Sequence, residues 1–238
     1  MKTILITGAS GGIGQAISKT LAKKSNNLIL VYNKHKPNIL DIQPHCSVEI
    51  FQCDLANTDQ IKIMVEKLIK KHKRIDALIN CAGISKFQQI QDTTDKDFYE
   101  IIDNNLKSTL MLTSLVSKHM IREQSGNIIN ISSMWGKVGS SMESLYSASK
   151  GAINSLTLAL AKELGPSNIN VNAICPGLIE TKMNNNLSKE TIQEIVDNTP
   201  IGRIGKPKDV ANLVEFLISE KAKFITGQII SVDGGFSL

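Results

Sequence analysis

Short apolar runs alternate along the chain with longer segments in which apolar residues recur every three or four positions. The runs predict buried strands, and the recurring pattern predicts helices with one buried face. The predicted strands cover residues 2–7, 27–32, 47–53, 75–80, 127–131, 169–174 and 227–232. The predicted helices cover residues 15–24, 57–73, 95–123, 145–164 and 207–219. Because strands and helices alternate, we expect an α/β fold: a doubly wound, seven-stranded parallel sheet with helices on both faces.

Two segments fit neither pattern. Residues 37–44 have room only for a stunted helix. Residues 181–203 mix Asn, Ser and short helical turns, so 184–203 is expected to form a mobile lid over a site. No linker, composition break or internal repeat divides the chain. The sequence therefore predicts one domain over residues 1–238.

Composition narrows the class of protein. Hydrophobic residues make up 42% and charged residues 21% of the chain, as in folded globular proteins. The formal charge of +5 is spread along the predicted helices, which favours anionic ligands such as nucleotides but does not indicate nucleic-acid binding. No apolar run is long enough to span a membrane. The four cysteines form no C-x-x-C pair, which predicts a cytoplasmic protein with reduced thiols and no metal site.

A glycine-rich turn, Gly8-Ala-Ser-Gly-Gly-Ile-Gly14, stands between the first strand and the first helix. In that context a glycine motif binds phosphate. Gly8 would allow the tight turn, Gly12 would let the backbone approach a pyrophosphate, and Gly14 would let the helix pack on the strand. The free N–H groups and the dipole of the helix add to the attraction for an anion. The predicted phosphate-binding turn also includes Ser10, Gly11 and Ile13.

The ends of the second and third strands indicate which dinucleotide binds. An acidic residue near the end of the second strand would bond a ribose 2′-hydroxyl, whereas basic residues suit a 2′-phosphate. Here Asn33 and Lys34 follow the strand and no acid is present, which favours NADP(H) over NAD. Asp54, with Leu55 beside it, follows the third strand and is placed to bond the adenine amine.

A Tyr and a Lys share one face of the fourth predicted helix. Tyr146 and Lys150 are four positions apart, so both side chains project into one site. A neighbouring cation lowers the pKa of a phenol from its usual value of about 10. Such a phenol can exchange a proton with an alcohol or a carbonyl oxygen. In the preceding long helix, Asn104 and Asn105 interrupt the apolar pattern, and a buried Asn there needs a bonding partner.

Together these motifs resemble the short-chain dehydrogenase/reductase family over essentially the whole chain, which implies a Rossmann fold. The matching motifs are Thr7-Gly8-x-x-x-Gly12-x-Gly14, Asn80-x-Ala82-Gly83, Asn105, Ser133, Tyr146-x-x-x-Lys150 and Pro176-Gly177. Ser133 precedes Tyr146 by 13 positions, the spacing typical of the family. Cys81 departs from the pattern, because the family most often has Asn there; we expect little effect on the chemistry.

The resemblance implies a role for each catalytic residue in ketone reduction. Tyr146 would donate a proton to the carbonyl oxygen as hydride arrives, and Ser133 would hydrogen-bond the same oxygen. Lys150 would bind the nicotinamide ribose and lower the pKa of Tyr146. Asn105 would hold a water that links Lys150 to solvent, and the side chain of Ser132 would face the other way. The remaining cofactor contacts implied are Asn80, Ala82, Gly83, Pro176, Gly177, Ile179 and Thr181.

The chain most resembles the branch of 3-oxoacyl-acyl-carrier-protein reductases, in its length, in Pro200-Ile-Gly-Arg203 and in the ending 225–235. That branch docks the acidic acyl carrier protein with basic residues, whose positions hold Gln124 and Ser167 here. Arg122 and Lys162 lie nearby and could substitute. The segment 135–145 also departs from that branch; its Trp135 could shape the pocket or pack beneath the loop.

Two other functions remain open from the sequence. The Ser-Ser-x-Trp-Gly and Glu-x-x-Tyr-Ser patterns also resemble a smaller branch, thought to reduce an aminopentanone group on a lysine of elongation factor P. The second is a non-catalytic regulator that binds NADP, although such a protein would not need Ser133, Tyr146 and Lys150. The long helices 95–123 and 145–164 carry surplus apolar surface, and with the family resemblance this predicts a homotetramer.

Overall fold

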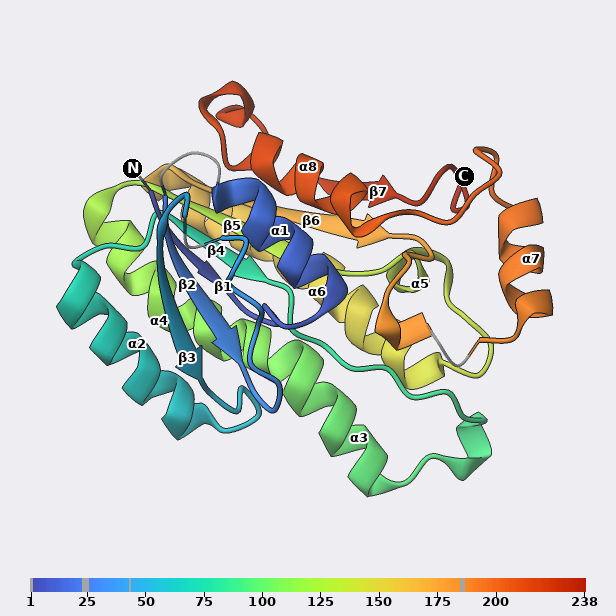
Figure 1. Ribbon diagram of the computed structural model, residues 1–238. Coiled ribbons are helices and arrows are strands. Elements are labelled where there is room, and N and C mark those ends of the chain that lie inside the picture. The colour runs from blue at the N-terminus through green and yellow to red at the C-terminus, as the bar shows by residue number, and fades with distance from the viewer. Residues whose placement is uncertain (1, 23–25, 43, 185–186) are drawn as a thin grey trace.

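Seven parallel strands form one sheet in the order β3-β2-β1-β4-β5-β6-β7. The strands are β1 Thr3–Ile6, β2 Asn27–Tyr32, β3 Ser47–Gln52, β4 Ala77–Asn80, β5 Gly126–Ile131, β6 Ile169–Pro176 and β7 Ile229–Val232. The strand order reverses direction between β1 and β4, as in doubly wound folds. The computed structural model describes residues 2–22, 26–42, 44–184 and 187–238 (Figure 1). The predicted fold class is confirmed.

Helices cover both faces of the sheet (Figure 1). They are α1 Gly12–Ala22, α2 Thr58–His72, α3 Asp95–Ile102, α4 Ser108–Glu123, α5 Trp135–Val138, α6 Ser144–Leu164, α7 Lys189–Asp197 and α8 Pro207–Leu217. A π-helical turn, Asp103–Lys107, joins α3 to α4. Single 3₁₀ turns lie at Ile90–Asp92, Gly165–Ser167, Lys182–Asn184 and Glu220–Ala222.

Alternation along the strands divides the buried side chains into two cores. Ile4 and Ile6 of β1 pack with α1 and α8 on one face. Leu5, between them, packs with α2, α4 and the end of α6 on the other face. Strands buried on both faces need continuous apolar runs, and this is the pattern that the sequence shows. Burial of each such side chain contributes about 1.5–3 kcal/mol, so the sheet is the rigid support for its loops.

Local signals fix where α2 and α3 begin. The side chain of Asn57 accepts from the backbone N–H of Asp59 and of Gln60, which caps α2. Thr94 and Asp97 form a capping box at the start of α3, in which each side chain bonds the other residue's backbone N–H. Caps of this kind typically contribute about 1 kcal/mol each to helix stability.

Three parts of the fold differ from the prediction. The stunted helix expected at 37–44 is wrong for the described part, which has irregular chain and turns. Residues 181–203 contain α7, capped by Ser188, in addition to short turns. Helix α5 was not predicted. Lys24, the expected end of the first helix, and residues 185–186 of the expected lid lie outside the described residues.

Within the ranges that the structure describes, no helix combines the length and apolarity needed to cross a membrane.

Candidate active site

The predicted site residues gather at the carboxyl edge of the sheet, around the point where the strand order reverses. The glycine turn follows β1, residues 81–83 follow β4 and Ser133 follows β5. Pro176 ends β6, and Met134 N donates to its carbonyl oxygen at 2.9 Å. Ligands of doubly wound sheets bind in the crevice at this switch point.

At Gly8 and Gly14 the backbone of the glycine turn leaves no room for a side chain. Gly8 has φ +62°, and a Cβ there would lie 2.8 Å from the backbone of Ala82. At Gly14 a Cβ would lie 2.2 Å from the carbonyl oxygen of Gly8. Helix α1 begins at Gly12, and the turn residues Ser10, Gly11 and Gly12 are exposed. A bare, exposed backbone at a helix N-terminus fits a pyrophosphate, as predicted.

The segment after β6 returns to the glycine turn. A Cβ on Gly12 would lie 2.8 Å from Cγ2 of Thr181, so the two segments are in contact. Ile179 is buried and forms a parallel bridge with Gly205, which anchors the segment. Gly177 N donates to Val232 O at 3.0 Å. The expected nicotinamide contacts therefore lie beside the expected pyrophosphate contacts, and the residues present fit an extended dinucleotide.

At the adenosine end, Asn33 Nδ2 donates to Asp54 Oδ1 at 3.3 Å, so these two predicted contacts lie side by side. Lys34 is exposed and has no ion pair among the described residues. Leu55 is 8% exposed and packs in the core, so its side chain is a structural contact. Lys34 is therefore available to an added negative charge at this end of the crevice.

Tyr146 and Ser133 meet at the substrate end. The Ser133 hydroxyl lies close enough to the Tyr146 phenol to favour its ionised form, and Ser133 Oγ accepts from Trp135 N at 3.1 Å. Lys150 Nζ lies 5.7 Å from the centroid of the Tyr146 ring and donates to Ile131 O at 2.9 Å. Ser132 Oγ donates to Lys150 O at 3.0 Å, away from this group, as expected. The sequence therefore identified correctly which serine faces the tyrosine.

Burial dominates the electrostatics of this group. It raises the pKa of Tyr146 to about 12, against a smaller lowering by the neighbouring Ser133 hydroxyl. It also lowers the pKa of Lys150 to about 8 and raises that of the Cys81 thiol to about 12. The lowering of the Tyr146 pKa expected from Lys150 is not found in this structure: burial raises the pKa, and Lys150 is not among the groups that shift it. Tyr146 therefore remains a neutral proton donor throughout the neutral pH range.

Asn105 lies in the π-helical turn and holds two segments together. Its Oδ1 accepts from Ile84 N at 2.8 Å, and its Nδ2 donates to Ile84 O at 2.9 Å and to Ser149 Oγ at 3.0 Å. A Cβ on Gly83 would lie 3.3 Å from both Asn105 Oδ1 and Lys150 Nζ. Asn105 thus borders Lys150, while its role in holding a water stays a prediction.

The side chain of Asn80 does not line the crevice as predicted. It is buried, and its Nδ2 donates to Thr113 Oγ1 at 3.1 Å and to Asn130 Oδ1 at 2.9 Å. Asn130 in turn donates to Thr157 Oγ1 at 2.9 Å. On β4 the side chains alternate between faces, which directs Asn80 toward α4. Ala82, two residues later, remains at the edge of the crevice, where its N–H donates to Thr7 Oγ1 at 3.1 Å.

Two features near the catalytic group were missed or left open by the sequence. Trp135 packs edge-on against Phe236, with ring centroids 5.5 Å apart, so it is a packing residue beneath the loop. Glu143, the residue before α6, hydrogen-bonds Ser85 from the segment after β4. In the sequence, only the Glu-x-x-Tyr pattern could have indicated that Glu143 lies near the site. In the described ranges no group of three or more His, Cys, Asp or Glu could hold a metal ion.

Comparison with known proteins gives matches over nearly the full length. The adh_short_C2 family model, described as enoyl-(acyl carrier protein) reductase, matches residues 8–237. The uncharacterized oxidoreductase YmfI of Bacillus subtilis is 42% identical, over 99% of this chain and 98% of that protein. The 3-oxoacyl-[acyl-carrier-protein] reductase FabG of Thermotoga maritima is 36% identical, over 98% of this chain and 97% of that protein. The crystal structure of a 3-oxoacyl-[acyl-carrier protein] reductase from Brucella melitensis superposes with a TM-score of 0.90 at 30% identity, covering 100% of this chain and 91% of that one.

Proposed function

The chain belongs to the short-chain dehydrogenase/reductase family and is an oxidoreductase that uses a nicotinamide cofactor, and on that premise we propose that it reduces a ketone to a secondary alcohol with NADPH. The observation that carries the proposal is that the hydroxyl groups of Ser133 and Tyr146 lie together beside the buried Lys150. Two hydroxyl groups that converge on one point suit a carbonyl oxygen.

The chain's own residues supply the proton and the orientation. Tyr146, kept neutral by burial, donates its proton to the carbonyl oxygen as negative charge develops there. Ser133 hydrogen-bonds the same oxygen and stabilises that charge. Lys150 carries the only cationic group in contact with the Tyr146 ring among the described residues, and it holds a ribose hydroxyl when the cofactor is present. The bound nicotinamide supplies the hydride.

The preference for NADPH rests on the end of β2. Lys34 is exposed and has no ion pair in the described chain. None of residues 32–36 carries a carboxylate. A 2′-phosphate beside Lys34 would gain a charge-assisted contact. Asp54 is engaged with Asn33 Nδ2 and with Ala56 N, so part of its hydrogen-bonding capacity is already used.

The first candidate substrate is a 3-oxoacyl thioester on acyl carrier protein, the substrate named for the Thermotoga and Brucella relatives. Arg122 at the end of α4 and Lys162 at the end of α6 are both exposed and offer positive charge for an acidic carrier. Gln124 caps α4 through Ile121 O and contributes no charge. Docking would therefore use Arg122 and Lys162.

A second candidate is the aminopentanone group on a lysine of elongation factor P, favoured by Glu143. The negative charge of this acid acts on the Tyr146 phenol, so its carboxylate lies near the reacting group. An amine-bearing substrate is cationic at neutral pH and would be attracted there, whereas a thioester is neutral. A non-catalytic regulator fits less well, because it has no need of the Ser133–Tyr146–Lys150 group.

We also propose a homotetramer in the cytoplasm. Apolar side chains are close to half exposed on the outer faces of three helices: Phe98 of α3 (47%), Leu110 of α4 (42%) and Leu158 of α6 (45%). Faces of this kind suit burial against a second copy. All four cysteines are free thiols, which fits a reducing compartment. Light scattering at micromolar concentration tests the assembly, and a monomer peak would refute it.

The test of function is NADPH oxidation with acetoacetyl thioesters of pantetheine and of acyl carrier protein, with NADH in parallel. Turnover with NADPH alone supports the first candidate and the role of Lys34. Turnover of a lysine-linked aminoketone, but not of the thioesters, supports the second. Reduction of a conjugated C=C bond and not of any ketone would refute the ketone assignment.

A further inference from the structure

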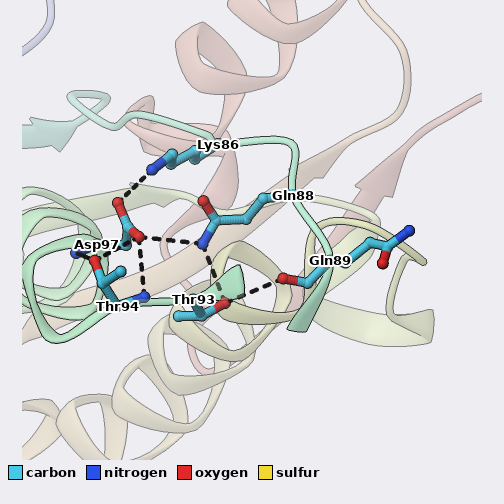
Figure 2. Close-up of polar contacts among 6 residues, drawn as sticks. All are labelled: Lys86, Gln88, Gln89, Thr93, Thr94 and Asp97. Atoms are coloured by element: carbon cyan, nitrogen blue, oxygen red, sulfur yellow. Dashed lines mark hydrogen bonds and ion pairs between the residues drawn. The ribbon is translucent and has the colours of Figure 1, made fainter. Parts of the chain in front are cut away.

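A polar network outside the catalytic group organises the segment between β4 and α3. Asp97, on the first turn of α3, accepts from Thr94 N at 3.0 Å and from Thr94 Oγ1 at 2.7 Å. The carboxylate of Asp97 also forms an ion pair with Lys86. Gln88, which lies beside Asp97, donates to Thr93 Oγ1 at 3.0 Å. Figure 2 shows these side chains converging on Asp97 from both arms of the segment. Asp97 is 6% exposed, so this is a buried hub.

The organised segment is tied to the start of the catalytic helix. Gln88 N donates to Met142 O at 2.8 Å, and Ser85 Oγ bonds the carboxylate of Glu143. Met142 has φ +64°, a left-handed conformation that an unbranched side chain adopts at a cost and that its surroundings must enforce. Tyr146 lies in the first turn of α6, one residue after Leu145.

Little space separates the network from the helix. A cavity of about 10 Å³, with room for about one water, lies between the two parts, lined on one side by Gln88 and Asp97 and on the other by Met142, Ser144 and Leu145. Side chains of the network and of the first turn of α6 therefore line the same small cavity.

A helix cap alone does not account for these contacts. A capping box needs only the reciprocal bonds between Thr94 and Asp97. The ion pair to Lys86 and the approach of Gln88 Nε2 to 3.5 Å of Asp97 reach beyond the helix, to the chain that contacts Met142 and Glu143. That ion pair also holds the pKa of the Asp97 carboxyl well below its usual range, so the charge persists at neutral pH.

We propose that Asp97 is a positioning residue for the reduction: it holds the segment 85–94 against Met142 and Glu143 and so fixes the Tyr146 phenol relative to Ser133. The proposal rests on the proposed function for its kinetic part only. Misplacement of a reacting group by about 1 Å can cost about 100-fold in rate, so a residue remote from the chemistry can control turnover.

The test compares Asp97→Asn with Asp95→Asn in the full-length protein. Asp97→Asn retains an oxygen that can accept from Thr94 N but loses the ion pair to Lys86. Asp95 is on the same helical turn and is exposed, and its side chain has no hydrogen bond or ion pair in the described structure, so it controls for the change in charge. We expect kcat to fall about 10-fold or more for Asp97→Asn, with the Kd of NADPH unchanged within about twofold. Asp97→Glu should restore part of the rate.

Amide hydrogen exchange gives a readout that needs no substrate. Asp97→Asn should raise exchange about 10-fold in residues 142–147 as well as in 85–94, whereas Asp95→Asn should change neither. Increased exchange confined to 85–97, with kcat unchanged, overturns the proposal. If the wild type reduces no ketone, the proposed function fails, and the exchange comparison still decides whether the coupling exists.

A second pair of variants covers the case in which Asp97→Asn does not fold. Gln88→Leu removes the side-chain link to Thr93 and leaves the backbone N–H that bonds Met142. Gln91→Leu is the matched change at an exposed position of the same segment. The proposal predicts increased exchange in 142–147 and lower kcat for Gln88→Leu only. Equal behaviour of the two variants contradicts it.

Discussion

The turn after β1 and the segment after β4 border the same crevice, but they are shaped by different means. In the turn, Gly8 and Gly14 bring backbone atoms so close that a single Cβ would collide with main chain. The segment after β4 is shaped by side chains instead: Asp97 bonds Thr94 and pairs with Lys86, and Ser85 hydrogen-bonds Glu143. The nucleotide side is therefore specified by missing side chains, and the substrate side by particular ones.

This difference separates what the family shares from what the individual chain selects. Any dinucleotide presents the same pyrophosphate, so one backbone shape suits many enzymes. Substrates differ in charge and size, so the residues opposite the nucleotide must vary with them. A variant that disturbs only the substrate side should therefore leave cofactor binding intact, and a variant on the nucleotide side should leave the substrate contacts intact.

The largest expected effect separates chemistry from cofactor binding. Tyr146→Phe removes the proton donor, and turnover should fall about 1,000-fold because general acid catalysis contributes factors of this size. The Kd of NADPH, measured by fluorescence titration, should stay within about twofold. Tyr99→Phe is the control, since Tyr99 is 62% exposed on α3. More than a tenth of the wild-type turnover in Tyr146→Phe would remove this residue from the mechanism.

The second-largest effect is expected from a substitution in the glycine turn on the nucleotide side. Gly14→Ala should lower the free energy of unfolding by about 1–3 kcal/mol and weaken NADPH binding, because its Cβ would meet the Gly8 carbonyl at 2.2 Å. At Gly165 a Cβ meets nothing within 4 Å, so Gly165→Ala is the matched control. Urea unfolding of both variants is the measurement. If Gly14→Ala had the same free energy of unfolding as the wild type, the turn could relax, and the absence of a side chain would not specify its shape.

A smaller effect is expected from pH, and it comes from the buried Lys150 between the two sides. Its folded pKa of about 8 lies below the usual 10.5, so between these values the unfolded chain binds more protons. The free energy of unfolding should therefore rise with pH, by about 2 kcal/mol between pH 7.5 and 9.5. Urea titrations at several pH values measure the slope. In Lys150→Met this rise should vanish, and an equal slope in both proteins would assign it to other groups.

The smallest predicted effect tests a charged side chain on the nucleotide side. Lys34→Met should raise the Kd of NADPH about 10-fold through loss of a charge-assisted contact and leave that of NADH unchanged. High salt should reduce the difference between the wild type and the variant. Lys36→Met, two residues further on, is the control. Equal losses for both cofactors would contradict a role in 2′-phosphate recognition.

The same contrast explains how much the sequence alone could predict. The glycine turn and the parallel sheet follow from a short motif and local periodicity, and the Ser133–Tyr146–Lys150 group follows from the family resemblance; the structure brings these residues together as predicted. The burial that raises the pKa of Tyr146 could not be predicted, because it depends on packing between segments far apart in the chain. The orientation of Asn80 toward Asn130 depends on the strand pairing. The apolar pattern predicted a helix that begins at Asp95, as α3 does, but it could not predict the contact of Asp97 with Lys86 or that of Gln88 with Met142.

The π-helical turn at Asp103–Lys107 changes how the long helix must be compared between relatives. Ser108 N bonds Asp103 O, five residues back, so the turn contains one residue more than an α-helix would have. Each residue of an α-helix advances about 100° around its axis, so α4 is out of phase with α3 by about that angle. Loss of one residue here would either rotate Asn105 away from Ser149 or turn the buried face of α4 toward solvent. An alignment of relatives must therefore treat this turn, and not the neighbouring loops, as the position where a single insertion or deletion changes the active site.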